Sequence, residues 1–153
     1  MAADAIWFGA AWLRASPVAY IFVNASHILS IGLILGAILP LDLRLMGAFR
    51  SVPLNLIGPF LLRCAMTGVA LAFVTGLWLF SVAPADYLAN QAFLVKAGLL
   101  AVAIFNIGFQ HVNPAFTRAL RGGPLTAGVK LSACASFILW LSILVAGRWI
   151  GFI

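Results

Sequence analysis

Four long stretches of this chain contain almost no charged residue, and they limit its fold more than any other feature. About twenty apolar residues, each rising ~1.5 Å in a helix, cover the ~30 Å hydrocarbon core of a bilayer. Hydrophobic residues make up 65% of the chain and charged residues 8%, whereas soluble domains contain roughly 45–50% and ~25%. We therefore expect an all-α protein, an integral-membrane four-helix bundle.

Prolines and polar residues predict where the helices begin and end. The expected transmembrane helices cover approximately residues 18–39, 56–82, 92–112 and 126–147 of a domain that runs from residue 17 to residue 153. Pro17 begins the first helix, and Pro40 is expected to end it. The Trp- and Leu-containing segment 1–16 is too short to span a bilayer, so we expect a short amphipathic helix lying in the membrane interface.

Basic residues are distributed unevenly between the two ends of the expected bundle. Six lie around the connections after the first and third helices, namely Arg44, Arg50, Arg63, Arg118, Arg121 and Lys130, and three lie at the other end, namely Arg14, Lys96 and Arg148. The positive-inside rule then predicts a multi-pass protein with these two connections in the cytoplasm and both termini outside. Bases at helix ends are explained by lipid headgroups, so the expected partner is the bilayer and not nucleic acid.

His27 lies near the middle of the first expected helix and is the strongest candidate for a metal ligand. An ionisable residue at membrane depth normally faces a partner, a cofactor or a water-filled cavity. Asn24 and Ser30 lie three residues to either side of His27 and share its helix face. Asn106, at a similar depth on the third helix, is expected to form an interhelical hydrogen bond rather than to bind a ligand.

Two further residues, Lys96 and His111, each allow two interpretations. Lys96 opens the third helix on the outer side, either as an interfacial anchor or as a cation directed into the bundle toward a carboxylate. His111 lies near the cytoplasmic end, either as an interfacial histidine with its own hydrogen bonds or as a ligand at a second site. His27 and His111 differ by ~15 Å in height, so one chain cannot place both on one iron.

Small residues and one ion pair are the expected contacts between helices. Gly32 and Gly36 on the first helix have GxxxG spacing, and Gly68, Ala72 and Gly76 recur every four residues on the second. Such positions allow either close packing of helices or the approach of a flat macrocycle. Arg63 is expected either to extend to the lipid headgroups or to pair with Asp42.

Several short motifs, taken together, resemble known membrane families. They are His27, Gly36, Leu43-Arg44, Thr75-Gly76-Leu77-Trp78-Leu79-Phe80 and Phe93-Leu94-Val95-Lys96. From about Tyr20 to Gly147 the chain resembles the families around the CopD (copper-resistance) domain and the HemJ-type protoporphyrinogen oxidase, a four-helix haem protein. The HemJ-type resemblance implies a b-type haem held by His27 and a functionally required Lys96. The CopD resemblance implies copper handling, although soft copper sites favour clustered sulfur and the chain has three methionines.

We therefore expect a membrane protein that binds haem b and serves redox chemistry or electron transfer, as a homo-oligomer or within a larger membrane complex. The expected cofactor-binding residues are His27, Lys96, Asn24, Ser30, Asn106 and His111. Whether the chain is itself a haem-dependent oxidoreductase stays open. The alternatives are a non-enzymatic accessory subunit, in which His27 is hydrogen-bonded to Asn106 or a serine, and CopD-like copper handling.

Overall fold

The computed structural model describes residues 7–152, and this part of the chain is helical without strands. The helices are α1 (Phe8–Ala15), α2 (Pro17–Met46), α3 (Leu54–Phe80), α4 (Pro84–Ala89), α5 (Gln91–Val112), α6 (Pro114–Leu120) and α7 (Ala127–Trp149). Four of them, α2, α3, α5 and α7, are long and apolar enough to cross a membrane. The predicted all-α architecture with four transmembrane helices is thereby confirmed.

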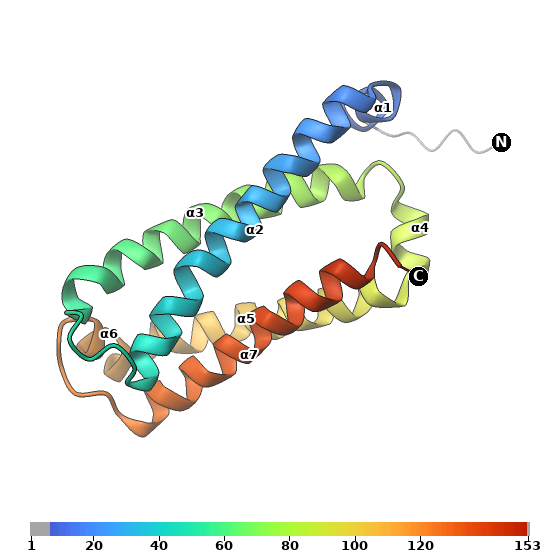
Figure 1. The fold of residues 1–153 in the computed structure, drawn as a ribbon. Coiled ribbons are helices and arrows are strands. Elements are labelled where there is room, and N and C mark those ends of the chain that lie inside the picture. The colour runs from blue at the N-terminus through green and yellow to red at the C-terminus, as the bar shows by residue number, and fades with distance from the viewer. Residues whose placement is uncertain (1–6, 153) are drawn as a thin grey trace.

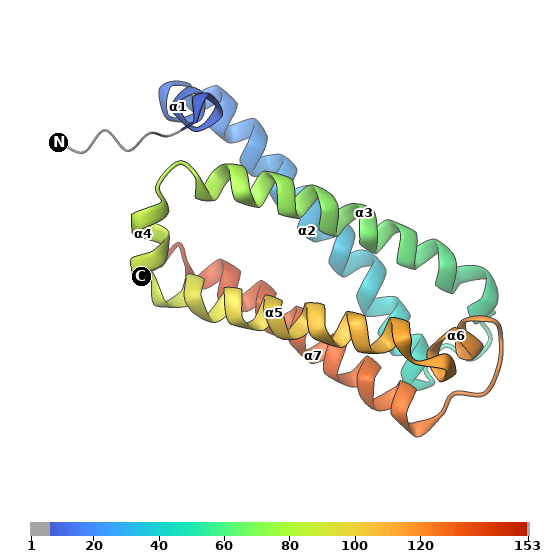
Figure 2. The same ribbon diagram turned by 180° about the vertical axis from the view of Figure 1, so that it is seen from behind.

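The long helices form two pairs that are joined along one seam. α2 packs against α3, α5 packs against α7, and the contact between α2 and α7 holds the pairs together, while α3 and α5 hardly touch. The pairs lie closest at the end that carries α6 and spread apart toward the end that carries α4 (Figures 1 and 2). The two ends of the bundle are therefore packed differently.

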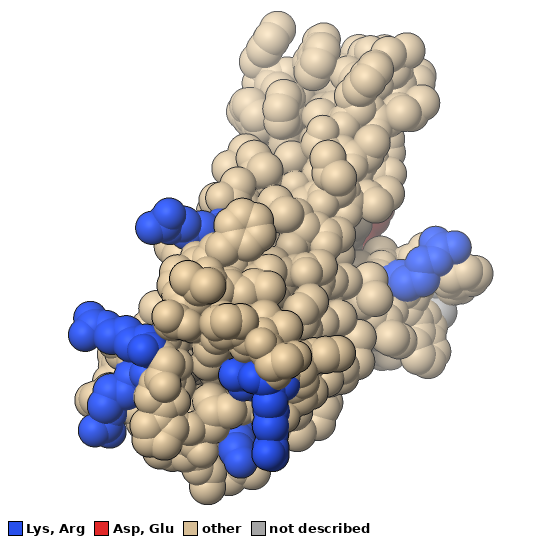
Figure 3. Space-filling model, turned by 60° about the vertical axis from the view of Figure 1, so that its left-hand side comes forward, with Lys and Arg blue, Asp and Glu red and all other residues tan. Residues whose placement is uncertain are grey.

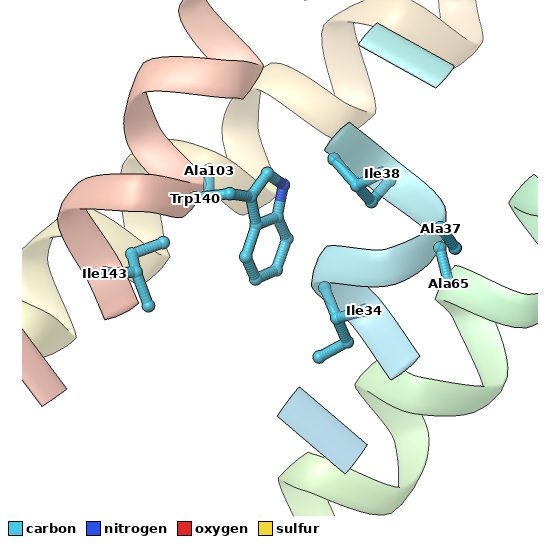
Figure 4. Close-up of a cluster of buried hydrophobic side chains, with 7 residues drawn as sticks. All are labelled: Ile34, Ala37, Ile38, Ala65, Ala103, Trp140 and Ile143. Carbon is cyan, nitrogen blue, oxygen red and sulfur yellow. The ribbon is translucent and has the colours of Figure 1, made fainter. Parts of the chain in front are cut away.

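Buried apolar side chains gather in the middle of the bundle and at the α6 end. The central cluster draws on all four long helices and contains Ile34, Ala37, Ile38, Ala65, Ala103, Trp140 and Ile143 (Figure 4). In it, the indole of Trp140 reaches from α7 toward Ile38 of α2. A second cluster lies beside α6 and contains Leu41, Leu45, Leu54, Phe116, Ala119, Val129 and Ala133. The outward faces carry exposed large hydrophobic residues, which suits contact with lipid.

The prediction that Pro40 ends the first long helix is wrong, because α2 continues to Met46. A proline inside a helix has no amide hydrogen for the carbonyl four residues earlier, and it costs about 3 kcal/mol in a soluble helix. Leu41 and Leu45 follow Pro40 and are only 2% and 1% exposed. Burying a leucine contributes roughly 1.5–3 kcal/mol, so their burial offsets the penalty and keeps the last turns helical.

Gly47 ends α2 by turning the backbone into the left-handed region, at φ +108°. The amides of Gly47 and Ala48 then bind the carbonyls of Arg44 and Leu43, at 3.1 and 2.9 Å. Glycine reaches this conformation without steric strain, so the glycine, and not the proline, is the stop signal here.

Close approach of helices occurs at the small residues of α3 and not at those of α2. A Cβ on Gly68 would lie 3.0 Å from the amide nitrogen of Ile34 and 3.1 Å from the carbonyl of Ser30. A Cβ on Gly32 or Gly36 would meet nothing within 4 Å. The packing interpretation therefore holds for α3 and is wrong for Gly32 and Gly36, which lie on the outer face of α2.

The short helix α1 lies within the predicted N-terminal segment, of which residues 1–6 fall outside the described range. Its side chains dock on the end of α3, where the Trp78 indole nitrogen donates to the Gly9 carbonyl at 2.9 Å. Trp7 and Trp12 pack against the Trp78 ring at centroid distances of 5.9 and 6.1 Å. The docking ties α1 to the bundle at its less tightly packed end.

Two further short helices, α4 and α6, stand where only connecting loops were expected. Each begins with a proline at its first turn, Pro84 in α4 and Pro114 in α6. Proline fits this position because the first amides of a helix have no helical partner. Asn113 also caps α6, since its side chain accepts from the Ala115 amide at 2.9 Å. Both prolines are thus helix starts.

Basic side chains surround the end that carries α6 and the connections on either side of it (Figure 3). Of the six named above, Arg44 is half-buried and the other five are exposed. The Arg44 side chain donates to the Val52 carbonyl at 2.8 Å, which holds the connection after α2 against the helix end. The charge asymmetry on which the predicted orientation depends is therefore present on the molecular surface.

Candidate functional site

His27 is held by a hydrogen bond between its ring and a threonine of the neighbouring helix. Its Nδ1 lies 2.9 Å from the hydroxyl oxygen of Thr75 on α3. When that hydroxyl donates its single hydrogen to the Leu71 carbonyl, 2.7 Å away, it accepts from Nδ1–H of the histidine. In this tautomer Nε2 carries the lone pair. The half-buried ring thus offers the nitrogen with which histidine binds metals.

Gly76 provides the space in which the His27 ring lies. A Cβ at Gly76 would stand 3.0 Å from Cε1 of the ring and 3.8 Å from Nε2. The imidazole therefore lies directly against the α3 backbone, one residue after the threonine that binds it. Any side chain at position 76 would displace the ring.

Lys96 runs along α7 toward the same region. A Cβ at Gly147 of α7 would lie 3.3 Å from the lysine Nζ, so the stem rests on the glycine. The ammonium is close enough to His27 for the two charges to interact. Within residues 7–152 it makes no ion pair, so the cation lies inside the bundle without an anion to neutralise it.

Of the polar neighbours predicted for His27, one stays available and two are engaged elsewhere. Asn24 is half-buried on the face of α2 that carries His27. Ser30 is buried and donates to the Ser26 carbonyl of its own helix at 2.7 Å, so it is satisfied without a ligand. Asn106 donates to the Ser132 carbonyl of α7 at 3.2 Å, and its predicted interhelical hydrogen bond is confirmed.

His111 lies apart from His27, near the α6 end. Its exposed ring hydrogen-bonds through Nδ1 to the Ile107 carbonyl of its own helix at 2.9 Å and packs against Phe116. The structure therefore fits the interpretation of a histidine satisfied by its own hydrogen bond. It leaves His27 as the candidate ligand inside the bundle.

A comparison with protein families shows to which family the chain belongs. The model of the Family of unknown function (DUF6644) matches residues 5–153. The chain belongs to this family. No curated protein and no solved structure matches it. The function of this DUF6644 protein must therefore be argued from its own residues.

An open cavity lies above His27 at the α4 end of the DUF6644 bundle. Its volume is about 280 Å³, and its lining residues are Tyr20, Val82, Ala83, Asp86, Tyr87, Asn90 and Ile150. Tyr20 lies seven residues before His27, on the same face of α2 and two turns above it. Burial, followed by the proximity of Tyr20, raises the pKa of Tyr87 in α4, so its hydroxyl stays neutral at physiological pH. The cavity is thus lined by two tyrosines and one acid, Asp86, and His27 is not among its lining residues.

Thr75 was given no role from the sequence, and Gly76 was expected only to allow close packing of helices or the approach of a macrocycle. A threonine in an apolar helix is usually satisfied by its own backbone, as Thr75 also is. Only the packing of α3 against α2 shows that the hydroxyl also forms a hydrogen bond with His27. The adjacency of threonine and glycine was the signal available in the sequence.

Proposed function

We propose that this DUF6644 protein binds haem b in the membrane through Nε2 of His27, and that it serves redox chemistry or electron transfer. The observation that carries the proposal is the hydrogen bond between Nδ1 of His27 and Thr75, because Nε2 keeps its lone pair when the Thr75 hydroxyl donates to the Leu71 carbonyl. Histidine ligands commonly donate their other ring nitrogen to a fixed acceptor, which orients the ring and raises its basicity.

Two neighbours of His27 suit the edge of a haem. The Lys96 ammonium is without an anion among the described residues and would neutralise a propionate. Asn24 offers an amide on the same helix face. Bound haem would supply one-electron chemistry, while the protein sets the axial ligand, the burial and the access of other molecules.

Copper handling has less support from the side chains. Within residues 7–152, no group of three or more His, Cys, Asp and Glu residues lies close enough together to hold a metal ion. Cys64 and Cys134 are free thiols on different helices. The iron of a haem already has the four nitrogen ligands of its porphyrin and can be held by a single histidine. A bare copper ion needs more ligands from the protein.

The visible absorption spectrum of the purified protein tests the haem proposal. We expect a Soret band from the full chain in detergent, lost in His27→Ala and retained in His111→Ala, which removes the only other histidine. Thr75→Val keeps the volume of the side chain but removes the acceptor for Nδ1–H, and we expect it to weaken haem binding by about 10–100-fold. A folded, colourless protein that does not take up added haem would contradict the proposal and favour the accessory-subunit alternative.

The distribution of basic residues and the number of histidines near His27 support a proposal for the location and assembly. We propose a bacterial inner membrane protein with both termini in the periplasm, assembled as a homo-oligomer or in a larger complex, because the described part of one chain offers no second histidine near His27. Labelling of a single cysteine placed after Gly151 should occur from the periplasmic side only. Light scattering of the detergent complex should give more than one chain per particle.

A further inference from the structure

Asp42 is the most deeply buried charged residue among those the structure describes. It lies near the end of α2, 2% exposed, and its Oδ2 has no hydrogen-bond partner. The Ser136 hydroxyl of α7 binds the carboxyl group. A buried carboxylate is strongly disfavoured unless a base or another cation neutralises it.

No base among the described residues neutralises Asp42. The predicted ion pair with Arg63 is wrong, because Arg63 is exposed on α3 while Asp42 faces α7. Arg44, two residues further along α2, donates to the Val52 carbonyl. Among the other titratable groups on the surrounding helices, those exposed are His111, Arg118, Lys130 and Arg148. Cys64 and Cys134 are half-buried thiols, and the half-buried Lys96 of α5 lies beside Gly147 near the other end of α7.

The surroundings of Asp42 supply oxygen atoms rather than positive charge. Ser132 lies one turn before Ser136 on the same buried face of α7, and its hydroxyl oxygen has no partner. The Asn106 amide nitrogen is engaged by the Ser132 carbonyl, which leaves the amide oxygen of Asn106 available. Asp42 of α2 and the two serines of α7 are thus buried together, and the half-buried Asn106 of α5 is tied to them through Ser132. Hard cations take ligands of this kind.

We propose that Asp42 binds an exchangeable monovalent cation, a sodium ion or a proton, in the polar layer that it forms with Ser132, Ser136 and Asn106. One positive charge neutralises the single carboxylate. Sodium would use the hydroxyl and amide oxygens as further ligands, whereas a proton would remain on Oδ2 and be donated to one of them. The site lies fifteen residues from His27 on α2, about 22 Å away, and does not depend on haem.

Thermal unfolding of the detergent-solubilised full chain tests the proposal. The midpoint is measured in sodium chloride and in choline chloride at constant ionic strength, for the native protein, Asp42→Asn and Asp86→Asn. Asp86 is an exposed acid on α4 and serves as the matched control. If sodium is the ligand, the midpoint rises with sodium concentration in the native protein and in Asp86→Asn, and does not respond in Asp42→Asn, since only the native fold binds the ion.

If a proton is the ligand, the midpoint does not respond to sodium. The infrared spectrum of the native protein then contains the carbonyl band of a protonated carboxylic acid, which is absent from Asp42→Asn and present in Asp86→Asn. The proposal is overturned if the unfolding midpoint of the native protein does not respond to sodium and its spectrum also lacks that carbonyl band. It is equally overturned if Asp42→Asn retains the sodium response or the carbonyl band of the native protein. If Asp42→Asn fails to fold, the same measurements are made on Ser132→Ala. The proposal is then overturned if Ser132→Ala changes neither the sodium response nor the carbonyl band.

Discussion

The two ends of this bundle are built from similar apolar helices but packed in opposite ways. At the α6 end, side chains from α2, α3, α6 and α7 close into one cluster in which Ala119 and Ala133 are fully buried. At the α4 end the helix pairs have separated, cavities open beside Asp86 and Asn90, and aromatic side chains cover the helix ends. His27 and Lys96 belong to the open end, and Asp42 belongs to the closed end.

This difference indicates which end maintains the fold and which end is available for ligands. A tightly packed region loses stability with any change in volume, whereas a loosely packed region tolerates change and admits other molecules. The haem proposal places its site where the packing is loose. The cation proposal places its site at the tightly packed end, where an unneutralised buried charge is most unfavourable. Substitutions that compare the two ends can test the distinction directly.

The largest expected effect comes from truncating a leucine at the closed end. Leu45→Ala removes a side chain that is only 1% exposed, and such changes cost about 2–5 kcal/mol because a cavity stays behind. The matched change Leu88→Ala, on α4 at the open end, removes a side chain that is 56% exposed and should alter stability by less than about 0.5 kcal/mol. Chemical or thermal unfolding in detergent measures both. Equal effects would mean that the ends are not packed differently.

A smaller effect is expected where α2 and α3 meet. Gly68→Ala places a methyl group 2.8 Å from Cγ1 of Ile34 and 3.0 Å from its backbone nitrogen, so the helices must move apart at a cost of about 1–3 kcal/mol. Gly32→Ala adds the same methyl group to the outer face of α2, where it meets nothing within 4 Å. We expect that control to be neutral or to stabilise by up to about 1 kcal/mol through helix propensity. A destabilised Gly32→Ala would instead show that this face packs against another chain.

The smallest effect is expected at the contact of α1 with the open end. Trp78→Phe removes the indole donor to the Gly9 carbonyl but keeps an aromatic ring, and the loss of one such hydrogen bond costs about 0.5–1.5 kcal/mol. Hydrogen exchange of the α1 amides should become faster while exchange in α5 stays unchanged. Trp149→Phe, at an exposed position, is the control. Protection of α1 that is unaffected by Trp78→Phe would show that the tryptophan does not hold this helix.

The sequence was sufficient to predict the four long helices, because twenty apolar residues in a row have few alternatives. It failed where tertiary contacts outweigh local signals. Pro40 was taken as a stop, but the packing of Leu41 and Leu45 extends the helix past it. Gly32 and Gly36 have the spacing of a packing motif and nevertheless face outward.

The candidate site was predictable in part. His27 and Lys96 could be selected because titratable residues are rare in such helices, and the structure brings both toward the interior. Thr75 could not be selected, since its hydrogen bond to His27 joins residues 48 positions apart. Asp42 was considered only as a possible partner of Arg63, just beyond the helix end expected at Pro40. Its burial depends on the extra turns of α2, which no local pattern revealed.

Those extra turns also bear on how the protein fits its bilayer. α2 has 30 residues and is about 45 Å long, whereas α5 has 22 residues and reaches about 33 Å. Only the shorter length matches the hydrocarbon thickness, so hydrophobic mismatch must be absorbed by tilt or by a terminus standing in the headgroup layer. Because α2 ends in Arg44 and a glycine turn, its last turns suit the layer where water and ions exchange freely. The Asp42 carboxylate, although buried from lipid, would then lie within a few ångströms of the aqueous layer from which its cation comes.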